Sequence, residues 1–368
     1  MTTPSGLAGI VIVKEVIEMT KIIGFLVAVV AVALSVALSR DAVAARGDEV
    51  ADLIGILEVG EPVYYENLTI IPVYTTRTSD NSPYTTLDEA MDNKWLEITE
   101  VEGGRVPQVK VTNHSDRYIF LMGGEILTGC RQDRLVGRDV LLGPKSKDVI
   151  VPVYCVEHGR WTYESSTFSS KKNLGTVRLR AESQKGAGDA QTNIWSEVSQ
   201  LGERAGAPSA TDRFQSVFES ETARRKIGDL EARLGTIPDL YPDVTGVIVG
   251  VGPEITSVDI FATPSLFARL WPKILKSSAL ADLGHDSYHS ITQSDAIDFL
   301  RELHEKQYAE KPAVDLGFEL SAVDYEVNVN ALVYRNAVIH VAGFPEAHPV
   351  HGEKPRDPER RIPVIRRP

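Results

Sequence analysis

The sequence has little cysteine and no excess of basic residues. Its 368 residues include two cysteines, which form no CxxC pair and no Cys/His run with zinc-ligand spacing. Disulfide-scaffold and structural zinc proteins are therefore excluded. Lys and Arg number 39 against 51 Asp and Glu, a formal net charge of −12. Because binding to a phosphate backbone needs a basic patch, we expect no nucleic-acid partner.

Metal-ligand clusters are also missing. His285 and His289 are four residues apart, a common metal-ligand spacing, but no third ligand is apparent. We therefore predict no metal site and no cofactor. What remains is an ordinary globular composition, with 43% hydrophobic and 24% charged residues. A chain of this length is expected to form one large or two small units with a sizeable core.

One long apolar run stands near the N-terminus. Residues 22–39 read IIGFLVAVVAVALSVALS, with Lys21 before them and Ala-Val-Ala at 42–44. This order is typical of a signal peptide, although the run is also long enough to span a bilayer. Residues 1–45 are thus predicted to be a signal peptide or an uncleaved membrane anchor, with Met19 as the true start. The mature domain would be secreted, periplasmic or membrane-anchored, outside the cytoplasm.

Residues 50–165 have the pattern of a β-rich lobe. Short apolar or alternating runs recur at the spacing of a sandwich or barrel, among them 118–122 and 149–156. Thr86 and Glu89 have capping-box spacing and predict a short helix over 87–94. The expected fold class is α+β: an N-terminal antiparallel β-rich, sandwich- or barrel-like lobe, followed by a mixed lobe.

Residues 191–345 are predicted to form that mixed lobe of helices and β-hairpins. A strand, a tight turn at Gly252 and a returning strand precede Thr263, which has the position of a helix N-cap. A second hairpin is expected around Arg335-Asn336, and His340 in it is interpreted as a satisfied core histidine.

Two segments have compositions that suggest little regular structure. Residues 166–190 are rich in Ser, Lys, Gly and Ala and are predicted to be a mobile linker. Residues 346–368 are rich in Pro and Arg and are predicted to be a disordered tail.

Two motifs carry a family resemblance. Residues 123–134 read GGEILTGCRQDR, and residues 149–161 read VIVPVYCVEHGRW. In this order they resemble the ARG and Rhodanese-Phosphatase-superfamily-associated protein domain, the ARPP domain, as do 258–273 and 338–344. The resemblance covers roughly 55–345. It implies a domain of unknown function, whose name reflects a proposed genomic association with ADP-ribose and NAD metabolism.

The sequence departs from the family pattern at four positions of these motifs. Cys130 and Arg131 stand where a small residue and Lys are expected, Asp133 replaces Asn, and His158 replaces Gln. An exported protein would also not meet the cytoplasmic NAD pool, which weakens the intracellular reading that the family name suggests.

The same motifs contain a cluster of polar residues between apolar strands. Arg and Gln suit bidentate recognition of a carboxylate, a phosphate or an amide edge, and a buried glutamate is a candidate general base. The alternative is a buried ion-pair network that fixes a turn. The candidates are Glu125 and Glu157 as catalytic residues, and Gln132, Asp133, Arg134, His158 and Arg160 as ligand-binding residues.

The two cysteines form the last candidate feature. A Cys130–Cys155 disulfide would be permitted by export and would close a loop between two strands. A catalytic Cys155–His158 pair is disfavoured, because residues three apart on a strand face opposite sides.

Three functions remain open. The first is a binding or accessory module for a small anionic or nucleotide-like ligand. The second is a hydrolase that acts on ADP-ribose-like or phosphoester substrates. The third is a structural protein of the envelope, in which the polar cluster only stabilises the fold. The oligomeric state is not predicted.

Overall fold

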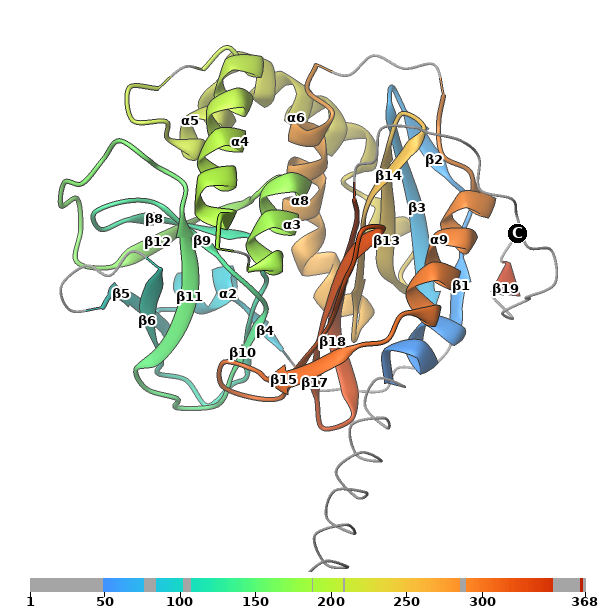
Figure 1. Cartoon of the computed structure of the whole chain (residues 1–368), viewed down its shortest axis with the longest axis horizontal. Helices are drawn as coiled ribbons and strands as arrows, with labels where there is room; N and C mark the ends of the chain where they lie inside the picture. Colours follow the sequence, from blue (N-terminus) through green and yellow to red (C-terminus); the bar gives the residue numbers. More distant parts are fainter. Residues whose placement is uncertain are drawn as a thin grey trace, which may run out of the picture. The chain divides into compact units, whose positions relative to one another are not determined.

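The computed structural model has an α+β fold built on antiparallel sheets (Figure 1). It describes residues 49–75, 84–101, 107–186, 188–207, 209–284, 289–346 and 365–366. The predicted targeting segment and most of the predicted tail lie outside these residues. Among the residues that are described, no helix is long and apolar enough to cross a membrane.

The largest sheet has ten strands. Their order is β15-β16-β17-β18-β14-β13-β3-β1-β19, and β2 also pairs with β3. Neighbours are antiparallel except β1 and β19. The strands are β1 (Leu57–Val59), β2 (Val63–Tyr65), β3 (Leu68–Thr75), β13 (Val244–Val251), β14 (Glu254–Phe261), β15 (Ala309–Pro312), β16 (Phe318–Val323), β17 (Val327–Tyr334), β18 (Ala337–Pro345) and β19 (Ile365–Arg366).

A second sheet of six strands curls into a half-barrel. Its order is β12-β8-β9-β11-β6-β5, and the curl brings its outer strands β12 and β5 into contact. The strands are β5 (Leu96–Glu100), β6 (Gln108–Asn113), β8 (Glu125–Gly129), β9 (Arg134–Val136), β11 (Val149–Cys155) and β12 (Phe168–Leu174). A three-stranded sheet, β10 (Val140–Leu142), β7 (Ile119–Leu121) and β4 (Thr85–Thr86), lies beside it. The predicted barrel-like character is confirmed.

Helices cover both faces of the ten-stranded sheet. Along β3, Ile70 packs in the core shared with α8, whereas Ile71 packs in the core shared with α9. This alternation follows from the two-residue period of a strand, and it explains why nearly all of β3 is buried. The helices are α2 (Leu87–Asp92), α3 (Val177–Lys185), α4 (Ala190–Arg204), α5 (Phe214–Glu219), α6 (Glu221–Leu234), α7 (Ile237–Leu240), α8 (Pro264–Ala281) and α9 (Gln293–Glu305).

Several local predictions are confirmed. Thr86 and Glu89 form the expected capping box at α2, and Thr263 caps α8 with Pro264 at its first position. The turn between β17 and β18 has φ values of 51° at Arg335 and 63° at Asn336. Two consecutive left-handed residues are typical of a type I′ hairpin turn.

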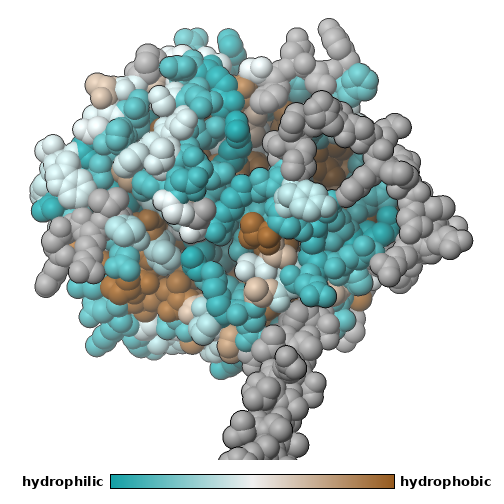
Figure 2. Space-filling model, in the orientation of Figure 1, coloured by the Kyte–Doolittle hydropathy of each residue, from teal (hydrophilic) through white to brown (hydrophobic). Residues whose placement is uncertain are grey.

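Two predicted boundaries are wrong. Residues 166–190, expected to be a mobile linker, contain β12, which pairs with β8 in the half-barrel, and α3, which packs against α4, α8 and β17. The β-rich lobe predicted over 50–165 is divided between two sheets, since β3 pairs with β13 in the large sheet and β1 and β2 pair with β3. The described residues from Glu49 onward form one compact unit. Its face in Figure 2 is largely hydrophilic, with a hydrophobic area over β6 and β11 of the half-barrel.

Candidate functional site

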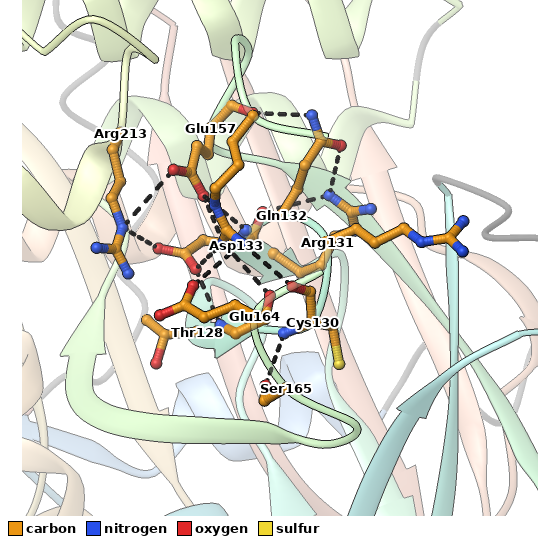
Figure 3. A network of polar contacts seen from close by, with 12 residues as sticks. Thr128, Cys130, Arg131, Gln132, Asp133, Glu157, Glu164, Ser165 and Arg213 are labelled. Carbon is orange, nitrogen blue, oxygen red and sulfur yellow. Dashed lines mark hydrogen bonds and ion pairs between the residues drawn. The ribbon is translucent and has the colours of Figure 1, made fainter. Parts of the chain in front are cut away.

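Asp133 lies at the centre of one buried polar cluster, in the turn that joins β8 to β9 (Figure 3). Its carboxylate is fully buried and accepts hydrogen bonds from Arg213 Nε at 2.8 Å and from Arg160 Nη2 at 3.2 Å. Arg160 Nε also donates to Glu157 Oε2 at 2.8 Å. We call Gln132, Asp133, Glu157, Arg160 and Arg213 the Asp133 cluster. Its carboxylates and guanidinium groups neutralise one another.

The local sequence explains why this turn closes on Asp133. Gly129 has a φ of 116° and Cys130 a φ of 47°, so the chain reverses within a few residues. The Gly129 amide donates to Asp133 Oδ1 at 3.0 Å, and the Asp133 amide donates to Glu157 Oε2 at 3.2 Å. The carboxylates therefore satisfy backbone donors of the turn as well as the arginines. Burial raises the pKa of Asp133, and Arg213 acts in the opposite direction.

Gln132 and Arg134 also form hydrogen bonds within the protein. Gln132 Nε2 donates to the Glu157 carbonyl at 3.0 Å, and its Oε1 accepts from Arg134 Nη1 at 3.0 Å. Arg134 is 1% exposed, and burial lowers its pKa. Five predicted residues are thus brought together, namely Gln132, Asp133, Arg134, Glu157 and Arg160, and their polar groups bind one another.

Two predicted residues lie apart from this cluster. His158 is exposed, and its ring packs 4.2 Å from the ring of Trp195. Glu125 belongs to a second buried group on the other end of β8, where Lys273 of α8 forms an ion pair with it and with Asp88 of α2, the latter at 2.8 Å. We call Asp88, Glu125 and Lys273 the Lys273 network.

Glu125 is fully buried, and its environment changes its acidity. Burial raises the pKa of this carboxyl to about 7, although the charge of Lys273 acts in the opposite direction. Burial lowers the pKa of Lys273, but Glu125 and Asp88 outweigh it and raise that pKa overall. The Met122 amide donates to Glu125 Oε2 at 2.9 Å. The network joins β8, α2 and α8.

A third buried group was not predicted as a site. His340 of β18 contacts Asp139 Oδ2 through Nδ1 at 2.6 Å and Asp259 Oδ1 through Nε2 at 3.1 Å. Arg180 of α3 binds both oxygens of Asp259. We call these four residues the His340 network. His340 is a satisfied core histidine, as predicted, but its partners were not foreseen.

Opposite charges set the acidity of this network. Burial lowers the pKa of His340, but Asp139 and Asp259 outweigh it and raise the value to about 9. Burial raises the pKa of Asp259, but Arg180 outweighs it and lowers the value to about 2. The network therefore holds charged groups in the interior, and it fastens β18 and β14 to α3.

The first residues of the GGEILTGCRQDR motif link these networks. The Gly123 amide donates to Asp139 Oδ1 at 2.7 Å. Gly124 has a φ of 101°, and a Cβ there would lie 2.5 Å from Arg180 Cγ. Glu125 follows in the Lys273 network. Glycine is required at 124 by both conformation and space, so this part of the motif holds the half-barrel against the rest of the fold.

The predicted disulfide is wrong, since Cys130 and Cys155 are both free and buried. Cys155 pairs in register with Arg134 on β9, and its thiol donates to the Glu157 carbonyl at 3.2 Å. Cys130 packs in the apolar core of the half-barrel. The two thiols therefore lie in different surroundings. Burial raises the pKa of Cys130 to about 11, which disfavours its reactive thiolate.

An open groove lies elsewhere, between α2 and the first turns of α8. Its volume is about 930 Å³. Among the described residues, its lining includes Tyr84, Trp95, Arg117, Arg269 and Glu89. Arg117 lies over the Trp95 ring, 5.0 Å from its centroid. This α2–α8 groove contains none of the predicted site residues.

No sequence pattern predicts that the residues lining this groove meet. Trp95 and Arg117 lie in the first half of the chain, whereas Arg269 lies in the second half, within the family-like segment 258–273, and no spacing connects the three. Nor did the sequence indicate Lys273 or Arg213 as partners of the predicted carboxylates. Among the described residues, no group of three or more His, Cys, Asp or Glu is arranged to hold a metal ion.

Comparison with known protein families gives a match over most of the chain. The family model of the ARG and Rhodanese-Phosphatase-superfamily-associated Protein domain, ARPP-1, matches residues 56–344. No curated protein and no solved structure matches the chain significantly.

Proposed function

We propose, since this chain belongs to the ARPP-1 domain family, that it is a non-catalytic module which binds a small anionic ligand in the α2–α8 groove. The observation that carries the proposal is the groove itself, with its volume of about 930 Å³ and its two arginines. Ligand pockets commonly have volumes of roughly 300–1,000 Å³ and combine apolar walls with a few polar groups.

The lining matches an anion that also carries an apolar part. Arg117 and Arg269 supply positive charge inside a protein whose formal net charge is −12. Guanidinium groups bind carboxylates and phosphates through paired hydrogen bonds. Trp95 and nearby prolines supply apolar surface for the remainder of the ligand. A nucleotide-like molecule has both parts.

The motif residues support a binding role less well. Asp133 is fully buried, and Glu157 is 2% exposed. Their oxygens accept hydrogen bonds from arginines and backbone amides. A ligand would have to displace these contacts and leave buried charges without partners, which is costly. Glu125 and Glu157 are both buried and paired with cationic side chains, so neither is placed to act as the general base of a hydrolase.

Titration calorimetry with inorganic pyrophosphate and with AMP tests the proposal. Arg269→Gln and Arg117→Gln should each weaken binding of the wild-type ligand at least about fivefold, because each removes a charge-assisted contact. The control is Arg225→Gln, which removes an exposed arginine of α6 that does not line the groove. Absence of wild-type binding, or equal effects of all three variants, would overturn the proposal.

We also propose that the protein is exported or membrane-anchored. The support is the sequence of residues 19–45, with its apolar run and the Ala-Val-Ala that follows it. Mass-spectrometric sequencing of the N-terminus, after expression in a secreting host, should find a mature chain that begins just after Ala44, or a membrane-bound chain that retains residues 22–39. A soluble product that still begins at Met1 would contradict this proposal.

A further inference from the structure

Glu89 places a carboxylate of the protein itself on the cationic side of the α2–α8 groove. Arg269 Nη1 donates to Glu89 Oε2 at 2.8 Å. The same oxygen accepts from the Thr86 amide at 2.9 Å and from the Thr86 hydroxyl at 3.2 Å. The side chains of Arg269 and Glu89 are 29% and 40% exposed. The arginine that would bind an anion is therefore already occupied by an accessible anionic group.

We propose that Glu89 is an internal competitor which a ligand must displace from Arg269, and that this competition selects ligands bearing a phosphate group over carboxylates. This inference rests on the proposed function of the groove. A ligand carboxylate would only replace one monovalent group by another. A phosphate monoester carries about 1.5 to 2 negative charges near neutral pH and three acceptor oxygens, so it gains more from Arg269 than Glu89 does.

The surroundings allow this exchange without unfolding α2. Lys273 lies one turn after Arg269 on α8, and it holds Asp88, the neighbour of Glu89, at 2.8 Å. Arg269 Nε donates to the Ser265 carbonyl at 3.0 Å, which keeps the guanidinium at the groove. When Arg269 turns to a ligand, α2 stays attached through Asp88, and Glu89 keeps its capping contacts with Thr86.

The capping box makes a clean substitution possible. Glutamine at this position also accepts from the N-cap backbone, so Glu89→Gln removes the competing charge and retains the cap. Asp92→Asn is the matched control, because it removes the same charge from the same helix outside the groove, where Asp92 pairs with Lys172. Glu89→Ala serves as a second variant, and thermal unfolding checks that each protein is folded.

Calorimetry with inorganic phosphate and with acetate measures the competition. Glu89→Gln and Glu89→Ala should bind phosphate about three- to fivefold more tightly than wild type, the size expected for release of a partly exposed ion pair. Their preference for phosphate over acetate should also fall, because acetate no longer competes with Glu89. Asp92→Asn should change the Kd for phosphate less than twofold.

The outcomes separate the two proposals. If wild type binds phosphate and Arg269→Gln weakens it, but the Glu89 variants bind no more tightly, the competitor role is wrong and the groove proposal stands. An equal gain in Asp92→Asn would also overturn the competitor role, since a general charge effect would explain it. If wild type and the Glu89 variants all fail to bind phosphate, pyrophosphate and AMP, both proposals fail.

Discussion

The half-barrel motif and the α2–α8 groove both contain arginines and carboxylates, but their surroundings differ. Asp133 and Glu157 of the Asp133 cluster and Glu125 of the Lys273 network are almost wholly buried. In the groove, Arg269 and Glu89 form an ion pair whose side chains are 29% and 40% exposed. Buried ion pairs are strongly destabilised when one partner is lost, whereas exposed pairs contribute little to stability and can exchange partners.

This difference assigns separate roles to the two regions. The residues that identify the family, from Gly123 to Arg134 and from Glu157 to Arg160, fasten the half-barrel to α8, α3 and the helix that begins after Arg213. Their charged groups form ion pairs and hydrogen bonds inside the fold. The groove has polar groups that a ligand can reach. A motif rich in charged residues is therefore not by itself evidence of an active site.

The largest effect is expected when the Lys273 network is broken. Lys273→Ala leaves Glu125 buried without its counter-charge and should lower the free energy of unfolding by about 3–5 kcal/mol. Urea unfolding followed by circular dichroism measures this change. The double variant Lys273→Met with Glu125→Leu should recover much of the loss, because the fully buried charge of Glu125 is then removed and Asp88, whose side chain is 16% exposed, can still contact solvent. A loss below about 1 kcal/mol in Lys273→Ala would contradict this prediction, because so small a change is typical of an exposed ion pair such as that of Arg269 and Glu89.

The His340 network should make stability fall at alkaline pH. The pKa of His340 is raised to about 9 in the folded protein, above the ordinary value of about 6.5. Its stabilising contribution is therefore complete below about pH 6.5 and is lost as the pH rises through 9. The loss should be on the order of 3 kcal/mol.

Urea unfolding of wild type and His340→Gln between pH 6 and pH 10 measures this contribution. The difference between the two proteins should shrink across that range, because only wild type carries the titrating imidazole. Parallel pH profiles would show that His340 is neutral in the fold.

Gly124→Ala, which affects the contact with Arg180 of the His340 network, should lower the free energy of unfolding by a smaller amount. The new Cβ would meet Arg180 Cγ at 2.5 Å and the residue would keep a φ of 101°. We expect a loss of about 2 kcal/mol in the free energy of unfolding. Gly228→Ala in α6 is the control, since nothing lies within 4 Å of its Cβ position, and alanine there favours the helix. Equal stability of both variants would contradict the role given to Gly124.

The smallest effect on stability is expected in the groove. Arg269→Gln removes one partly exposed ion pair and should change the free energy of unfolding by less than about 1 kcal/mol, while it weakens anion binding. Thermal unfolding and calorimetry on the same preparation measure both quantities. A large loss of stability without a change in binding would mean that Arg269, like Arg160, serves the fold.

Much of the local structure followed from the sequence. The capping box at Thr86 and Glu89, the Thr263-Pro264 start of α8 and the hairpin at Arg335-Asn336 were all predicted, because each depends on residues only a few positions apart. The family motifs predicted that Gln132, Asp133, Arg134, Glu157 and Arg160 meet. β12 and α3 were missed because residues 166–190 are rich in Ser, Lys, Gly and Ala, although Thr176 caps the start of α3 and Gly186 ends it in a left-handed conformation.

The sequence by itself determined the α+β class, the family and the polar cluster of the motifs. Tertiary structure alone decided that this cluster is buried, that Cys130 and Cys155 face different surroundings, and that Trp95, Arg117 and Arg269 line one groove. The physical reason is distance along the chain. Caps and turns are fixed by neighbours, whereas burial and the pairing of charges depend on residues such as Glu125 and Lys273, which are 148 positions apart.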